Sequence, residues 1–219
     1  MQLVIGNKNY SSWSMRPWVA LREARIPFEE VQLTFGDDGK PVGVEAWSPT
    51  RKVPVLVLDG GERIWDSLAI CEAAAELYPD RKLWPLAPEA RRAARAVCAE
   101  MHSGFEGLRS AMAMNMRARH PGKGMTPQVR ADIERIVELW TSCRARFGGE
   151  GALLFGAFTI ADAFYAPVVT RFETYEVPLP AAAQAYCEAV RRLAAVREWT
   201  EAARRETDFV PADEPHATR

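Results

Sequence analysis

The sequence predicts a two-part fold, an α/β domain over residues 1–79 followed by an all-α domain over residues 86–207. Before Pro79, short apolar runs of strand type alternate with stretches of helical periodicity. After residues 83–86, apolar side chains recur only at helical spacing. Because alternating and purely helical patterns belong to different layer architectures, we expect two domains.

The first part follows a strand–helix–strand order and then a strand–strand–helix order. We expect a first helix that ends near Arg25, a second that starts at Ser67, and strands over Gln2–Gly6, Phe28–Leu33, Val55–Asp59 and Arg63–Trp65. A turn-rich link at 36–47 precedes the third strand, and Asp59-Gly-Gly-Glu62 predicts a hairpin between the last two strands.

Hydroxyl side chains occupy the turn between the first strand and the first helix. Ser11, Ser12 and Ser14 lie here, and Pro17 follows them. Since proline is tolerated in the first turn of a helix, where its missing N–H would be unpaired anyway, we expect the N-cap no earlier than Ser14. Ser11 and Ser12 would then lie in the loop beside the helix N-terminus.

Two more polar elements stand at the start of later segments. Pro54 precedes an apolar strand run, so the Val53–Pro54 bond is a candidate cis peptide that would expose the Val53 backbone groups. Asp66 and Ser67 open an amphipathic helix, whose free N–H groups and hydroxyl favour a carboxylate. Together with the serine turn, these elements predict a site for one small anionic ligand.

In this order the motifs resemble those of the glutathione transferase superfamily, over nearly the whole chain. The resemblance implies a thioredoxin-like N-terminal domain that holds glutathione and an all-helical C-terminal domain that holds a second substrate. Ser11, Ser12, Ser14 and Arg16 look most like the zeta class, whose activities include maleylacetoacetate isomerisation. That class carries a cysteine after its two serines, where this chain has Trp13.

The family resemblance also implies what the residues of the site do. A free thiol is mostly protonated at neutral pH, and a hydroxyl donor at a helix N-terminus favours the thiolate. Ser11 is the expected donor to the sulfur, with Ser12 as the alternative. Trp13 is also expected to contact glutathione, and Lys52 is expected to reach its glycyl carboxylate. The backbone of Val53, before Pro54, would bond the cysteinyl part. Asp66 would meet the γ-glutamyl amine, and Ser67 the γ-glutamyl carboxylate.

The second-substrate pocket is expected to contain Trp13, Phe105, Met112 and Met116, with Met114 as a further candidate on what we expect to be one long helix. The alternative is that these side chains are core residues, because Met112 and Met116 have ordinary helical spacing. Three polar residues nearby either bind an acidic substrate or face water: Arg109, Asn115 and Arg117.

A helix-capping motif lies in the second part. Thr159 and Asp162 have the spacing of a capping box, in which each side chain bonds the backbone of the other. We interpret both as structural residues. Hydrolase chemistry is excluded, because no histidine is placed to complete a triad and no Gly-x-Ser-x-Gly turn occurs.

Composition sets the remaining expectations. A formal net charge of -1 gives no electrostatic reason for a nucleic-acid partner. Membrane-spanning and signal-peptide patterns are absent from the sequence, so we expect a cytoplasmic protein. The four cysteines are widely spaced and predict buried free thiols, and the three histidines suggest no metal site. Residues 208–219 lack apolar periodicity and predict a disordered tail.

The leading functional hypothesis is an enzyme that adds a serine-activated glutathione thiolate to a small electrophile, with a zeta-like cis-trans isomerase as the alternative. By resemblance, a homodimer and a role in detoxification are also expected. An omega-type oxidoreductase would need a cysteine near Ser11, which is absent. Reductive or ether-cleaving enzymes would use the same serine. A non-catalytic binding module would be expected to lose Ser67 or the hydroxyl turn, and both are present.

Overall fold

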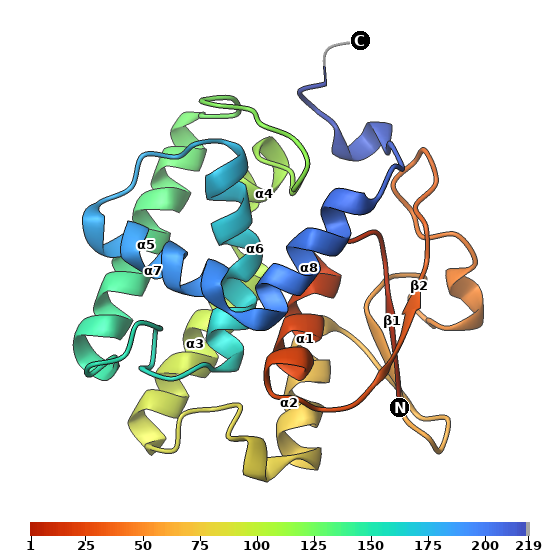
Figure 1. Ribbon diagram of the computed structural model, residues 1–219, viewed down its shortest axis with the longest axis horizontal. Helices are drawn as coiled ribbons and strands as arrows, with labels where there is room; N and C mark the ends of the chain where they lie inside the picture. Colours follow the sequence, from red (N-terminus) through yellow and green to blue (C-terminus); the bar gives the residue numbers. More distant parts are fainter. Residues whose placement is uncertain (218–219) are drawn as a thin grey trace.

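The computed structural model describes residues 1–217 and has a small mixed sheet beside a helical body (Figure 1). The sheet order is β2-β1-β3-β4, in which β1 pairs parallel with β2 and antiparallel with β3, and β4 is antiparallel to β3. The strands are β1 (Gln2–Ile5), β2 (Glu29–Gln32), β3 (Val55–Val57) and β4 (Arg63–Ile64). The expected hairpin between β3 and β4 is confirmed, because the Leu58 N–H donates to the Glu62 carbonyl at 2.9 Å.

Helices make up the rest of the fold. They are α1 (Ser12–Glu23), α2 (Ser67–Leu77), α3 (Pro88–Ser103), α4 (Glu106–Ala111), α5 (Pro127–Phe147), α6 (Ile160–Thr174), α7 (Ala181–Arg192) and α8 (Ala194–Arg205). Short 3₁₀ turns occur at Val44–Ala46, Pro79–Arg81 and Pro211–Asp213. The predicted fold class, an α/β part followed by an all-helical part, is confirmed.

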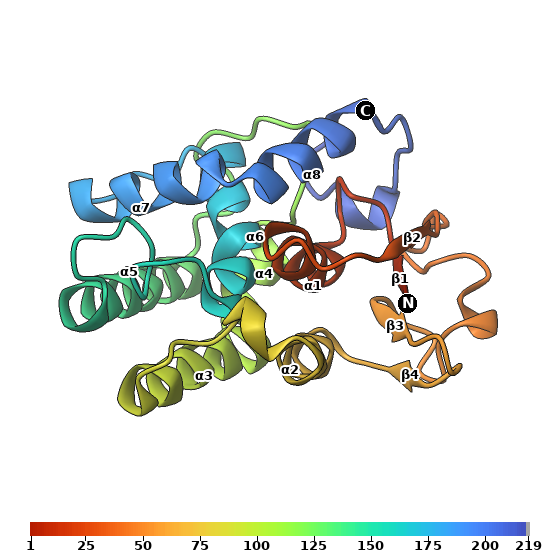
Figure 2. The ribbon, with the colours of Figure 1, turned by 60° about the horizontal axis from the view of Figure 1, so that its bottom comes forward.

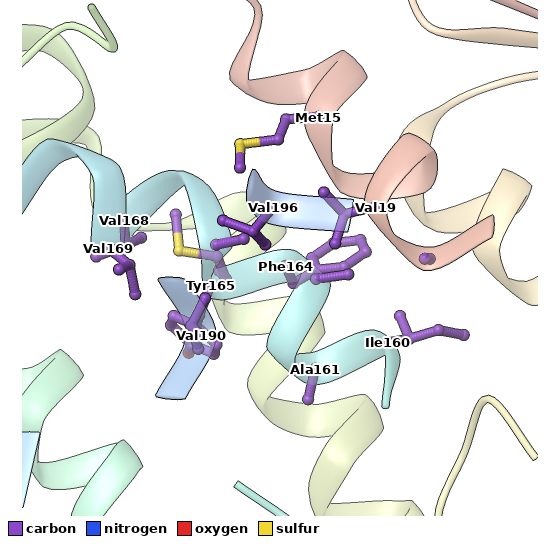
Figure 3. Packing of buried hydrophobic residues seen from close by; sticks show 14 of the residues in the cluster. Met15, Val19, Ile160, Ala161, Phe164, Tyr165, Val168, Val169, Val190 and Val196 are labelled. Carbon is purple, nitrogen blue, oxygen red and sulfur yellow. The ribbon is translucent and has the colours of Figure 1, made fainter. Parts of the chain in front are cut away.

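One core joins the two parts. Helices α1 and α2 lie between the sheet and the other helices (Figure 2), and α1 contacts both β1 and α6. Figure 3 shows Met15 and Val19 of α1 near Phe164 of α6 and Val196 of α8, and all four side chains are buried. Because this core is continuous across α1 and α6, the start of α1 is held in a fixed position against the helical body.

The N-terminus of α6 is fixed by the predicted capping box, which is confirmed. The Asp162 carboxylate accepts from the backbone N–H of Thr159 at 2.9 Å and from its hydroxyl at 3.2 Å. It also accepts from the Leu154 N–H at 3.1 Å and from the Tyr186 hydroxyl at 3.2 Å, contacts that sequence spacing did not indicate. This fully buried carboxylate therefore holds the loop before α6 and helix α7 together.

The stretch expected to be one long helix is broken. Helix α3 ends at Ser103, α4 ends at Ala111, and residues 112–126 are irregular. Distant side chains supply the hydrogen bonds that a helix would otherwise make: the Asn9 side-chain oxygen accepts from the N–H of Met116 at 2.8 Å, and Arg171 Nε donates to the Met112 carbonyl at 2.8 Å. The helical spacing of Met112 and Met116 in the sequence therefore does not correspond to a helix in the structure.

We expect Gly124→Ala to destabilise the protein more than Gly122→Ala does. Both glycines lie in the same loop at nearly the same positive φ, +70° and +71°, so the strain of a left-handed alanine, about 1 kcal/mol, is common to both. A Cβ on Gly124 would lie 2.4 Å from the Ala111 carbonyl oxygen, whereas one on Gly122 would meet nothing within 4 Å. Urea unfolding should show about 1–3 kcal/mol of extra loss for Gly124→Ala. Equal losses would contradict the predicted clash.

The C-terminal segment contacts both parts of the protein as far as His216, an arrangement that differs from the disorder expected for residues 208–219. Val210 is 1% exposed, the Tyr10 hydroxyl donates to Glu214 Oε1 at 2.7 Å, and the His216 ring lies 3.0 Å from the Ala111 carbonyl oxygen. These partners are distant in sequence and gave no local signal. The rest of the predicted tail, 218–219, lies outside the described residues, and the domain bounds 1–79 and 86–207 remain predictions.

All four cysteines are free and buried, as predicted: Cys71, Cys98, Cys143 and Cys187. Burial raises the pKa of each thiol, to about 11 for Cys143 and about 12 for Cys187. Among residues 1–217, no group of three metal-ligating side chains gathers. No described helix is long and apolar enough to cross a membrane.

Candidate functional site

A cleft of about 960 Å³ lies where the sheet domain meets the helical body. The predicted site residues that line it are Ser11, Ser12, Trp13, Lys52 and Val53. Its other walls include Met114, α4, Arg171 of α6, and Asp213 of the C-terminal segment. Two of the three polar elements expected from the sequence therefore meet at one cleft.

Ser11, not Ser14, is the N-cap of α1, which begins at Ser12. The Ser11 oxygen accepts from the Ser14 N–H at 3.3 Å, and its hydroxyl donates to Ser14 Oγ at 2.8 Å. Pro17 consequently lies inside the helix, contrary to expectation. Burial along this helix offsets the hydrogen bond that Pro17 cannot donate, since tertiary packing supplies most helical stability.

Ser12 is contacted by a buried arginine. The Arg171 guanidinium donates from Nη2 to the Ser12 Oγ at 3.3 Å. Arg171 is 4% exposed, and it also donates to the carbonyl oxygens of Met112, at 2.8 Å, and Pro167, at 3.3 Å. The start of α1 is therefore tied directly to α6.

Trp13 stands beside two further arginines. The guanidinium carbons of Arg16 and Arg109 lie over its ring, 4.3 and 4.4 Å from the centroid. The His102 ring packs edge-on against Trp13 at 5.2 Å. Cation–π contact of this kind fixes the indole and keeps positive charge at the cleft.

These arginines make the cleft locally cationic. Burial, with the nearby charges of Arg171 and Arg109, lowers the pKa of Arg16 to about 9, and burial with the charge of Arg109 lowers the pKa of Arg171 to about 10. Both therefore remain cationic at neutral pH. The charged side chains that line the cleft are Lys40, Arg51, Lys52, Arg109 and Arg171 against Glu45, Glu106 and Asp213.

The turn before β3 has the predicted geometry at its proline. The Val53–Pro54 peptide bond is cis, as expected, and Pro54 is buried. Val53 and the exposed Lys52 line the cleft, and the Lys52 N–H donates to the Ser48 hydroxyl at 3.2 Å.

Asp66 and Ser67 do not line the cleft in this structure. Asp66 caps α2 by accepting from the Leu68 N–H at 3.0 Å, and its other oxygen pairs with His102 Nε2 at 3.1 Å. Ser67 is 0% exposed, and its hydroxyl has no partner among residues 1–217. A buried polar atom without a partner is uncommon in a folded protein, and here it stands where a ligand carboxylate was expected.

The predicted second-substrate residues are only partly brought together. Trp13 lines the cleft, but Phe105 and Met112 are buried outside it, and Met116 lines a different hollow of about 590 Å³ between α6 and α8. Met114 lines the cleft. The core alternative therefore describes Phe105 and Met112 better.

Arg171 and Asp213 are the cleft residues that sequence reasoning missed. A lone arginine in the apolar stretch of α6 is a usable signal, because a buried charge without a sequence-local partner commonly serves a site. Asp213 gave no such signal, since it lies in the segment expected to be disordered. Of the polar residues considered earlier, Arg109 lines the cleft, whereas Arg117 donates to the Glu206 and Asp208 carbonyl oxygens.

The donors present fit a small thiol peptide with two carboxylates. Hydroxyls stand at a helix N-terminus, where a thiolate is favoured. Lys52 and the arginines offer charge to a carboxylate, and the Ser67 hydroxyl is an unused hydrogen-bonding group. The arrangement can thus bind an anion and favour a thiolate.

Comparison with protein families gives two matches. Residues 10–77 match the glutathione S-transferase N-terminal domain, and residues 89–202 match the glutathione S-transferase C-terminal domain. Together they cover most of the chain.

Curated relatives are more distant. The chain is 36% identical over 97 residues to a probable maleylacetoacetate isomerase of Caenorhabditis elegans, a match that covers 44% of each protein and so less than half of that relative. It is 24% identical over 177 residues to glutathione S-transferase omega-1 of Rattus norvegicus, which covers 80% of this chain and 69% of the rat protein.

Solved structures share the fold over nearly the whole chain. A glutathione transferase homolog from Burkholderia GL BGR1, crystallised with bound glutathione, has a TM-score of 0.71 at 23% identity and covers 94% of this chain and 98% of that one. A zeta-class bacterial maleyl pyruvate isomerase has a TM-score of 0.70 at 22% identity, with complete coverage of both chains. At such identity these similarities establish architecture alone.

Proposed function

Because the chain belongs to the glutathione S-transferase family, we propose that it is a glutathione transferase in which a serine at the start of α1 stabilises the glutathione thiolate. The observation that carries this proposal is the meeting of Ser11 and Ser12 with Lys52 and Val53 at one cleft. A hydroxyl donor and the positive end of α1 both favour a sulfur anion.

The proposed chemistry starts with ionisation of the bound thiol, whose proton passes to water. The thiolate then forms a carbon–sulfur bond with a small electrophile. In a substitution, the displaced electron pair departs with the leaving group. When the thiolate instead adds across a double bond, the electron pair moves to the neighbouring carbon, which takes a proton. The serine keeps its own proton throughout and only donates a hydrogen bond.

Glutathione is proposed to lie along the cleft with its glycyl carboxylate near Lys52 and its cysteinyl part against the backbone of Val53, beside Pro54 and Trp13. Its γ-glutamyl group would meet Asp66 and Ser67. Since the Ser67 hydroxyl is fully shielded, this end of the site must open when the ligand binds, and the contact that we expect to shift is the one between Asp66 and the half-buried His102, at 3.1 Å.

A cis-trans isomerase is the second candidate, favoured by the arginines of the cleft. Arg109 and Arg171 place two cationic groups where the second substrate would lie, which suits an electrophile that carries a carboxylate. The names of two similar proteins, a probable maleylacetoacetate isomerase and a maleyl pyruvate isomerase, point the same way. The proposal also includes a homodimer and a cytoplasmic detoxification role.

We expect glutathione mixed with stoichiometric protein to show ultraviolet thiolate absorbance at lower pH than free glutathione does, because the site stabilises the anion. S-methylglutathione, which has no ionisable thiol, is the control: it should bind without any such absorbance. Binding with an unshifted thiol pKa would favour a non-catalytic assembly role, and absence of binding would reject the proposed function.

A second arm of the same experiment separates the two candidates. Electrophiles are compared as the free carboxylate and as the neutral amide of the same skeleton. Preference for the carboxylate supports the isomerase-type substrate, because only the charged form can pair with Arg109 and Arg171. Equal rates would favour a general transferase.

A further inference from the structure

The two serines of the cleft differ in what occupies their hydroxyl groups. The Ser11 hydroxyl donates to Ser14 Oγ and its oxygen accepts from the Ser14 N–H, while Ser14 Oγ in turn accepts from the Gly6 N–H at 3.1 Å. Both hydrogen-bonding functions of Ser11 are thus used to cap α1 and to attach it to the end of β1.

The Ser12 hydroxyl has the opposite arrangement. Its oxygen accepts from Arg171 Nη2 at 3.3 Å, and among residues 1–217 its proton has no acceptor. Ser12 lines the cleft, so that proton is available to a ligand. A hydroxyl that accepts from a cation is polarised and becomes a stronger donor to an anion.

Arg171 is built to hold this position. Its Nε and Nη1 donate to two carbonyl oxygens, those of Met112 and Pro167, which leaves Nη2 aimed at Ser12. No carboxylate lies within ion-pair distance of it in the described chain, and Asp213, which lines the same cleft, acts on its charge only from beyond that distance. A planar guanidinium fixed by two carbonyls cannot be replaced in geometry by a flexible ammonium.

We propose that Ser12, rather than Ser11, is the catalytic hydroxyl that donates to the glutathione sulfur, and that Arg171 is its positioning residue. This assignment rests on the proposed function. It makes thiol activation depend on a contact between α1 and α6, because Ser12 and Arg171 lie 159 residues apart in the chain.

Other charges around the site act on both serines. Arg16 lies on α1, Arg109 and Glu106 on α4, Lys52 before β3, and Asp213 on the C-terminal segment. Since these charges are the same in both serine variants, they set a common baseline for the pKa of a bound thiol. The difference between the two serine variants therefore isolates the hydroxyl contact.

The test is the pKa of the glutathione thiol bound to Ser12→Ala, compared with the matched variant Ser11→Ala. We expect Ser12→Ala to raise this pKa by about one unit or more and to lower kcat/KM about tenfold or more at neutral pH, with recovery at higher pH. Ser11→Ala should lower thermal stability by loss of the cap and leave the thiol pKa nearly unchanged. Affinity for S-methylglutathione should be retained in both.

Arg171→Lys tests the positioning role while it keeps the charge. We expect an intermediate rise in the thiol pKa, and no rise beyond that of Ser12→Ala alone when the two substitutions are combined, because the arginine acts through the serine. The assignment is overturned if Ser11→Ala raises the thiol pKa and Ser12→Ala does not, or if the two effects simply add. A wild-type protein that fails to bind S-methylglutathione would overturn the proposed function and this assignment together.

Discussion

Asp162→Ala is expected to lower the free energy of unfolding by about 3–5 kcal/mol. The fully buried carboxylate accepts from the backbone N–H groups of Thr159 and Leu154 and from the hydroxyls of Thr159 and Tyr186. Alanine would leave these donors without a partner in a dry environment, and it would release the start of α6, on which Arg171 lies. Urea unfolding measures the loss.

The matched control is Asp162→Asn, which keeps the shape and one acceptor oxygen. We expect it to lose less than Asp162→Ala does, because its amide still accepts from part of the donor set. A loss below about 1 kcal/mol for Asp162→Ala would contradict the structural role of the carboxylate.

The same pair of proteins tests a pH dependence. Burial raises the pKa of Asp162 to about 6 from an ordinary value of 3.8, so the folded state binds this proton more tightly than the unfolded state does. Its contribution to stability therefore falls as pH rises from about 4 to about 6, by about 3 kcal/mol, and is constant above that. Asp162→Asn should lack this component of the wild-type profile.

Asn9→Ala is expected to cost about 2–4 kcal/mol of unfolding free energy, the second largest effect. Asn9 is fully buried, and its side-chain oxygen accepts from the N–H groups of Met116, at 2.8 Å, and Arg117, at 3.0 Å. Its amide donates to Asn115 Oδ1 at 3.0 Å. The substitution would leave the Met116 N–H without an acceptor and the Arg117 N–H with only its longer bond to Asn115 Oδ1, at 3.2 Å, and it would loosen residues 112–118 next to the cleft.

Chemical unfolding of Asn9→Ala, Asn115→Ala and the double variant checks this network. We expect the double variant to lose clearly less than the sum of the single losses, since both residues belong to one set of hydrogen bonds. Additive losses, or a single loss under about 0.5 kcal/mol for Asn9→Ala, would show that the contact contributes little.

What the sequence predicted correctly is local. The hairpin at residues 59–62, the cis bond at Val53–Pro54, and the capping box at Thr159 and Asp162 each depend on residues within a few positions of one another. Such patterns are readable because turn and cap chemistry depends on residue type and short spacing.

The features that the sequence could not predict depend on contacts between residues far apart in the chain. Pro17 led to a wrong prediction of the N-cap of α1, because the packing of this helix outweighs one missing hydrogen bond. Residues 112–118 do not form a helix because Asn9 and Arg171 satisfy part of their backbone. Ser12 could not be distinguished from Ser11, since the contact that separates them comes from Arg171. Each of these features depends on a tertiary contact that no spacing rule contains.

The burial of the cysteines has a consequence if the protein acts on electrophiles as proposed. A thiolate is the form that alkylating agents attack, and burial keeps all four thiols protonated and out of reach. If glutathione is activated in the cleft as proposed, its sulfur is the most nucleophilic one available to an incoming reagent. Under the proposed function, incoming electrophiles would therefore not inactivate the protein by alkylation of its own cysteines.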